Sequence, residues 1–149
     1  MCDEKAPASF AVARIARLHR MASGKSLRAL GLYPGQEYVM IQLWISGASR
    51  QADLIKAADL DPSTVTKMLQ RLEQAGHVRR RPDPADRRAV LVEATEASTE
   101  LRTAVEAHLT ELEEQLLTGL DQHERHELLR LLAKTELNLC RTAGECAPE

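Results

Sequence analysis

The feature that most constrains the fold is a change of periodicity at Gly76, near the middle of the chain. Before Gly76, apolar residues follow the i, i+3, i+4, i+7 spacing of an amphipathic helix, at Val65, Met68, Leu69 and Leu72. After Gly76, residues 77–81 and 89–92 have the character of strands, and residues 82–88 between them are rich in proline and aspartate. The sequence therefore predicts a helix that ends at Gly76 and continues into a β-hairpin.

A short helix is predicted immediately before this one. Residues 50–58 turn four apolar side chains to one face, those of Ala52, Leu54, Ile55 and Ala58. In the turn that follows, Asp61 is suited to cap the next helix and Pro62 to occupy its first position. Two helices joined by a short turn are typical of a helix-turn-helix, and the hairpin that follows is typical of a wing.

Two helices are predicted on the N-terminal side of this unit. Residues 9–30 are amphipathic, and Ser9 is a suitable N-cap. Residues 34–46 are apolar around most of the helix, up to Ile45, so that burial on most sides is expected.

Two more helices are predicted on the C-terminal side. Thr95 is a suitable cap for a long helix that reaches about residue 120, and Asp121 for a last, leucine-rich helix. The expected fold class is mainly α with a small β-hairpin wing (α+β), in one domain of residues 1–149.

Three strings in this arrangement resemble those of the multiple antibiotic resistance regulator (MarR) family. They are LYPGQ at residues 32–36, LDPSTVTKMLQRLEQAG at 60–76 and DPADRRA at 83–89, where an Asp-x-Arg pair is typical of the family. The resemblance covers roughly residues 9–141 and implies a winged helix-turn-helix regulator. Its DNA-binding part would be residues 34–94, and its dimerisation helices residues 9–30 and 95–141.

The charge distribution agrees with a DNA-binding face. The net charge of the chain is −2, but residues 62–92 carry 7 basic and 3 acidic side chains, a balance of +4, whereas residues 93–149 carry a balance of −8. Only the contacting face of a protein needs to attract phosphate. A solvated polar surface remains the alternative for any single one of these residues.

The predicted DNA-binding residues lie on the second helix and on the wing. They are Ser63, Thr64, Thr66, Lys67, Gln70 and Arg71 on the helix, and Asp86, Arg87 and Arg88 on the wing. Short polar residues in the first turn allow close approach in the major groove, and the longer ones reach bases or phosphates. Arg88 is expected to enter a minor groove while Asp86 holds its guanidinium, and residues 79–81 to lie near phosphates.

The terminal helices predict a partner subunit, and the resemblance implies a small-molecule effector. The leucine-rich terminal helices predict a homodimer, which would place two recognition helices about one DNA turn, roughly 34 Å, apart on a pseudo-palindromic operator. The resemblance implies a repressor that is released by a small aromatic or acidic effector. The resemblance also implies pocket residues, on the helices that line the family's effector cavity: Arg17, His19, Met40 and Trp44.

Other classes have less support. No catalytic constellation is visible, and His123 with His126 make only half of a zinc site, so we expect neither an enzyme nor a cofactor or metal. No apolar run is long enough to span a membrane, and a cytoplasmic location is expected. The three cysteines are an odd count and are expected not to form a disulfide framework, while Ser9 stands at the family's peroxide-sensing position. The alternatives left open are a protein-interaction scaffold without DNA binding and a redox-responsive regulator.

Overall fold

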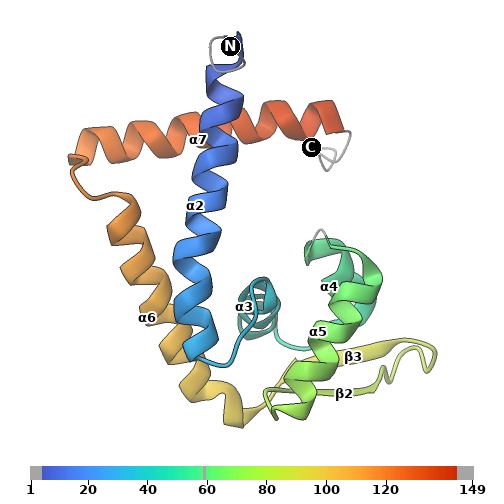
Figure 1. The fold of residues 1–149 in the computed structure, drawn as a ribbon. Helices are drawn as coiled ribbons and strands as arrows, with labels where there is room; N and C mark the ends of the chain where they lie inside the picture. Colours follow the sequence, from blue (N-terminus) through green and yellow to red (C-terminus); the bar gives the residue numbers. More distant parts are fainter. Residues whose placement is uncertain (1–4, 59, 144–149) are drawn as a thin grey trace. The chain divides into compact units, whose positions relative to one another are not determined.

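The computed structural model describes residues 5–58 and 60–143 of the 149-residue chain (Figure 1). It divides into two compact units, Met1–Leu112 and Glu113–Glu149. The first unit contains the predicted helix-turn-helix and hairpin, and the second contains the last helix.

Two long helices precede the helix-turn-helix in the first unit. Helix α2 spans Pro7–Ala29 and helix α3 spans Gln36–Ser46. The prediction that Ser9 caps α2 is wrong, because α2 begins two residues earlier at Pro7. Proline has no N–H to leave unsatisfied and its fixed φ suits the first turn of a helix.

The helix-turn-helix is formed by α4, Gln51–Ala58, and α5, Pro62–Gln74. As predicted, the Asp61 carboxylate caps α5 by accepting the Thr64 N–H at 3.0 Å. Gly76 follows α5 with a φ of 81°, a left-handed conformation that glycine adopts without steric strain. The local signals at both ends of α5 therefore operate as the sequence indicates.

The wing belongs to a three-stranded antiparallel sheet of order β1-β3-β2. Strands β2, Val78–Pro82, and β3, Val90–Ala94, form the predicted hairpin, with Arg80 opposite Val92. The strand β1, Ser49–Arg50, pairs with the other edge of β3 and was missed by the sequence analysis. Two residues are too few to show the alternating pattern of a strand in the sequence. Because Arg50 belongs to β1, the helix predicted from residue 50 begins one residue later, at Gln51.

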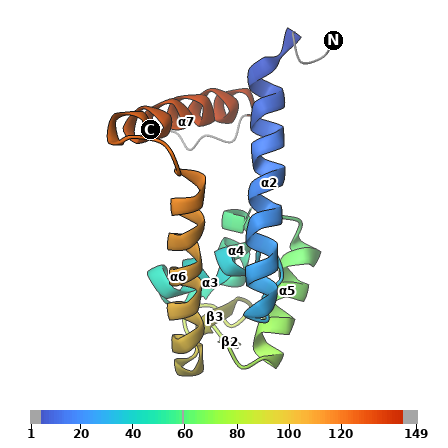
Figure 2. The same cartoon turned by 60° about the vertical axis from the view of Figure 1, so that its left-hand side comes forward.

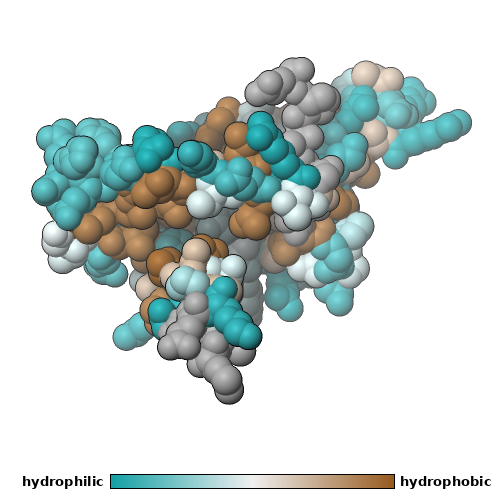
Figure 3. Space-filling model, turned by 90° about the horizontal axis from the view of Figure 1, so that it is seen from above, coloured by the Kyte–Doolittle hydropathy of each residue, from teal (hydrophilic) through white to brown (hydrophobic). Residues whose placement is uncertain are grey.

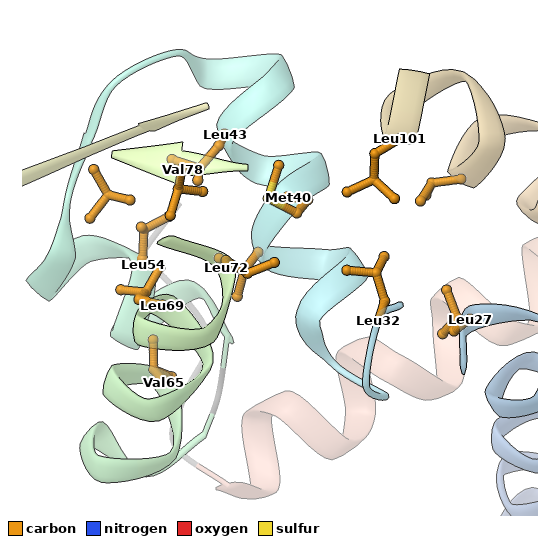
Figure 4. Close-up of a cluster of buried hydrophobic side chains, with 13 residues drawn as sticks. Leu27, Leu32, Met40, Leu43, Leu54, Val65, Leu69, Leu72, Val78 and Leu101 are labelled. Atoms are coloured by element: carbon orange, nitrogen blue, oxygen red, sulfur yellow. The ribbon is translucent and has the colours of Figure 1, made fainter. Parts of the chain in front are cut away.

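The core of the first unit lies where α3, α5 and the sheet meet the ends of α2 and α6 (Figure 4). Its side chains include Leu27, Leu32, Met40, Leu43, Leu54, Val65, Leu69, Leu72, Val78 and Leu101. Two predicted inward residues are wrong: Ile45 is 76% exposed and Ala52 is exposed. Only one face of α3 and one face of α4 meet the core, and these two residues lie off that face.

Helix α6, Thr99–Leu116, follows a short 3₁₀ turn at Glu96–Ser98. Thr95 does not cap α6: its hydroxyl donates to the Gly76 carbonyl oxygen at 2.5 Å, which ties the end of β3 to the end of α5. The part of α6 within the first unit runs beside α2 (Figure 2), and the side chains of His108 and Ser23 are hydrogen-bonded at 3.1 Å.

Helix α7, Gln122–Ala143, belongs to the second unit. Asp121 caps it as predicted, and the bond is reciprocal: Glu124 N–H donates to Asp121 and Asp121 N–H to Glu124, both at 2.9 Å. No residue of α7 is buried. Among the described helices, none is both long and apolar enough to cross a membrane.

The cysteines need one correction. The sequence analysis expects no disulfide framework, but Cys140, near the end of α7, is disulfide-bonded. An odd count excludes a fully paired set but leaves room for one bridge. Cys2 and Cys146 lie outside the described residues.

Candidate nucleic-acid interface

The first turn of α5 carries a tight polar cluster. The Ser63 hydroxyl donates to the Asp61 carboxylate at 2.5 Å, and the Thr64 hydroxyl donates to the same carboxylate. These bonds lower the pKa of Asp61 to about 2, with the Ser63 bond the largest cause. Both hydroxyl donors are therefore engaged, and the oxygens of Ser63 and Thr64 face a ligand mainly as acceptors.

Among the remaining predicted DNA-binding residues of α5, some side chains have a contact within the protein and others have none. The Thr66 hydroxyl donates to the Pro62 carbonyl oxygen at 2.8 Å, one turn earlier. Lys67 and Gln70 are exposed, and within residues 5–58 and 60–143 no hydrogen bond or ion pair holds their side chains. The Arg71 guanidinium carbon lies 4.8 Å from the centre of the Tyr33 ring, on the loop between α2 and α3.

Three arginines of β2 are held within the protein. Arg79 and Arg81 both pair with Glu93 of β3, and Arg80 pairs with Glu73 of α5 at 2.5 Å. The hydrogen bond from Arg79 lowers the pKa of Glu93, and the bond from Arg80 lowers the pKa of Glu73. The sequence analysis did not foresee these ion pairs, because Glu93 and Glu73 come from other segments of the chain, and the expected position of residues 79–81 near phosphates stays a prediction.

The tip of the wing is built around Asp83 rather than Asp86. Asp83 is buried, accepts the Ala85 N–H at 2.8 Å and accepts Arg50 Nε at 2.8 Å. Both contacts lower the pKa of Asp83, the backbone bond from Ala85 more than the bond from Arg50. The Asp83 N–H and the Ala89 carbonyl oxygen close the tip at 3.0 Å.

The predicted pairing of Asp86 with the Arg88 guanidinium is wrong. Asp86 instead accepts the backbone N–H of Arg88 at 3.0 Å. In the part of the chain that the structure describes, the guanidinium groups of Arg87 and Arg88 have no ion pair, and both residues are exposed. An aspartate two residues before an arginine reaches its backbone more readily than its distant head group, as in an Asx turn.

The two contacts of the Asp83 carboxylate predict how the stability of the wing depends on pH. Because its pKa is lowered, Asp83 should stabilise the wing above its unfolded pKa near 3.8 and lose this effect as the pH falls through its folded pKa. Arg50→Ala should raise the Asp83 pKa only part of the way, since the Ala85 bond remains. Carboxyl-carbon NMR titration would measure both values, and Arg87→Ala is the matched control. An Asp83 pKa at or above 3.8 in the wild type would contradict this account of the tip.

A cavity of about 440 Å³ lies beside α5 in the first unit. Its lining comes from α2, α3, the end of α4 and α5, and includes His19, Glu37, Tyr38, Thr64 and Met68. Of the predicted pocket residues, only His19 lines it. Met40 is in the core (Figure 4), Trp44 Nε1 donates to Ser98, and Arg17 Nη1 contacts Met21 Sδ at 3.4 Å.

The cavity wall contains polar groups that the sequence analysis missed. Burial raises the pKa of Glu37, an effect opposed by backbone hydrogen bonds from Glu37 and Gly35 and by the charges of His108 and His19. Ser23 and His108 are buried and bonded to each other. His108 and Ser23 are 85 residues apart, and no local sequence signal brings them together.

The described residues give no candidate metal site. Within them no group of three or more His, Cys, Asp or Glu side chains is placed to hold a metal ion. His123 and His126 are both exposed near the start of α7.

Comparison with known proteins relates the central part of the chain to a family. The model of the MarR family matches residues 32–90, which contain α3, the helix-turn-helix and most of the wing. A mutant MarR from E. coli, solved in complex with operator DNA, is 25% identical, with a TM-score of 0.76 over 89% of this chain and 96% of that one. Residues 32–90 of this chain carry a MarR-family domain.

Other MarR-type relatives extend the comparison. The transcriptional repressor NicR of Pseudomonas putida is 39% identical over 88 residues, 59% of this chain and 56% of NicR. The match spans about half the length of the curated relatives. Bordetella bronchiseptica BpsR, solved to explain regulation of its DNA binding by 6-hydroxynicotinic acid, is 26% identical, with a TM-score of 0.78 over 87% of this chain and 92% of BpsR. The mainly helical fold with a small winged sheet, expected from the sequence, is confirmed.

Proposed function

We propose that this protein is a MarR-family transcriptional regulator that binds duplex DNA through α5 and the wing. The observation that carries the proposal is the selective pairing of basic residues. Glutamates neutralise Arg79, Arg80 and Arg81, whereas Lys67 on α5 and Arg87 and Arg88 at the wing tip are exposed and have no ion pair among the described residues. Unpaired cations on α5 and at the wing tip suit one major and one minor groove.

The relatives support this proposal and favour repression over activation. NicR is named a transcriptional repressor, and the E. coli MarR structure holds operator DNA. We therefore favour a repressor that acts in the cytoplasm on a pseudo-palindromic operator. The relatives are regulators, which supports the prediction that the chain is not an enzyme.

Selection of genomic fragments with the purified protein tests the proposal. Gln70→Ala should relax sequence preference and cost about 1–3 kcal/mol where a bidentate base contact is lost. Arg88→Ala should weaken binding to selected and scrambled duplexes alike, with some extra loss at narrow A·T-rich flanks. Failure to enrich any fragment would contradict DNA binding and favour the scaffold alternative. Unchanged affinity of Arg88→Ala for both duplexes would remove the wing from the interface.

We also propose that the protein is a homodimer formed by the terminal helices. Large apolar side chains are exposed on α2 and on α7: Phe10, Val12, Ile15, Leu18 and Met21, and Leu129, Leu131, Leu132, Leu137 and Leu139. Figure 3 shows hydrophobic residues exposed next to hydrophilic ones. A soluble monomer rarely exposes so many large apolar groups on two helices, and a second copy would cover them.

Leu132→Asp should convert the dimer to a monomer, because a buried unpaired carboxylate strongly destabilises an interface. Sedimentation of the wild type and the variant at micromolar concentration would measure this change. Asn138→Asp, an exposed polar position on the same helix, is the matched control and should remain dimeric. A wild-type monomer would refute the proposed dimer.

A small aromatic or acidic effector is proposed for the cavity beside α5. The cavity shares Thr64 and Met68 with the recognition helix, so that an occupant would touch the element that enters DNA. BpsR makes 6-hydroxynicotinic acid a suitable first probe. We expect the probe to raise the melting temperature and weaken DNA binding, and Tyr38→Ala to reduce both effects. A melting temperature unchanged by the probe would exclude this compound as the effector.

A further inference from the structure

The contact between Tyr33 and Arg71 carries an inference that rests on the proposed function. We propose that Tyr33 is a positioning residue for DNA binding, whose ring holds the Arg71 guanidinium beside α5 in the orientation that DNA requires. Arg71 comes from the last turn of α5, and Tyr33 from the loop between α2 and α3. The guanidinium carbon lies 4.8 Å from the ring centre, within the range of a cation–π contact.

The backbone of Tyr33 is fixed from both sides. Its N–H donates to the buried Gln36 side chain at 2.9 Å, and its carbonyl oxygen accepts the Gln36 N–H at 3.0 Å. The preceding Leu32 is 1% exposed and belongs to the core. A ring mounted on so constrained a loop is a stable support for a long side chain.

The contact with the ring leaves Arg71 without a hydrogen-bond acceptor among the described residues. A guanidinium has five N–H donors, and a cation–π contact engages its charge without an acceptor atom, so these donors stay available to DNA. Among the residues described, no carboxylate pairs with Arg71, whereas Arg79, Arg80 and Arg81 each have one. Arg71 is therefore held in place without being neutralised.

The same contact explains why a large aromatic ring is exposed on this loop. Tyr33 is 55% exposed, and its neighbours Pro34 and Gly35 line the cavity while its ring reaches toward α5. Without the ring, the flexible Arg71 side chain would have to be ordered when DNA binds, and the lost rotamer freedom would weaken the complex.

The test compares Tyr33→Leu with Tyr33→Phe, which keeps the ring. Fluorescence anisotropy would measure affinity for the fragment-selected duplex and for a scrambled duplex at one salt concentration. Tyr33→Leu should bind about two- to fivefold more weakly and Tyr33→Phe like the wild type. In an Arg71→Ala background, Tyr33→Leu should have no further effect, because the group that it positions is gone.

A second readout does not depend on DNA. The ring current of Tyr33 should shift the Arg71 Nε–H resonance in NMR spectra of the free protein, and the shift should persist in Tyr33→Phe and vanish in Tyr33→Leu. Equal affinity of Tyr33→Leu and the wild type, tighter binding by Tyr33→Leu, or additive effects with Arg71→Ala would overturn the inference and leave the proposed function intact. If the wild type binds neither duplex, the proposed function fails, and the positioning role fails with it.

Discussion

Raising the salt concentration from about 50 to about 200 mM is expected to weaken duplex DNA binding about a thousandfold. On α5 and at the wing tip, three exposed cations of each protomer have neither an ion pair nor an aromatic contact among the described residues: Lys67, Arg87 and Arg88. A dimer would present six, and the logarithm of affinity should then fall with the logarithm of salt concentration with a slope near −5, at about 0.9 per neutralised phosphate. Anisotropy titrations at several salt concentrations would give the slope directly.

Two variants calibrate this salt dependence. Lys67→Ala should make the slope shallower by about 2 per dimer, because each protomer loses one phosphate contact. Arg79→Ala should change it less, since Arg79 is already paired with Glu93. A nearly flat dependence in the wild type would contradict the electrostatic account. Equal effects of the two variants would contradict the division between paired and unpaired basic residues.

Leu69→Ala should reduce the free energy of unfolding by about 2–5 kcal/mol. The Leu69 side chain is 0% exposed and packs in the core on the inner face of α5 (Figure 4). Its truncation removes buried apolar contacts and leaves a cavity that neighbouring side chains fill only in part. Urea unfolding followed by circular dichroism would measure the loss, at a protein concentration that keeps the oligomeric state constant.

The next residue on the same helix provides the control. Gln70 is exposed, so Gln70→Ala should change stability by no more than about 0.5 kcal/mol. We therefore expect Leu69→Ala to lower stability and Gln70→Ala to affect DNA recognition, although the two residues are adjacent. Equal destabilisation by both would mean that α5 is not oriented as the structure has it.

The recognition helix could be predicted because its limits are set by local chemistry. Asp61 and Pro62 begin it, Gly76 follows it, and the spacing of its apolar residues decides which face is buried. Each signal acts within a few residues, so the sequence carries it directly. The same reasoning succeeded at Asp121 and failed at Thr95, whose hydroxyl bonds to a distant segment.

The side-chain pairs of the wing could not be predicted in the same way. Arg50 and Asp83 are 33 residues apart, and their contact depends on how β1 pairs with β3. The Asp83–Pro84–Ala85 string is a recognisable signal for an Asx turn, and it would have indicated Asp83 as the organising residue. The resemblance to the family instead directed attention to Asp86 and Arg88, which are joined through the backbone.

Two ion pairs connect the wing to the helix-turn-helix that precedes it. Arg50, just before α4, bonds Asp83 at the tip, and Glu73 of α5 bonds Arg80 of β2. The recognition helix and the wing should therefore move as one rigid body, and the protein would then set the spacing between the two proposed groove contacts. DNA that does not match this spacing must bend or change its groove width, at an energy that depends on its sequence. We therefore expect base preferences at operator positions between the two contacts, where no side chain reaches.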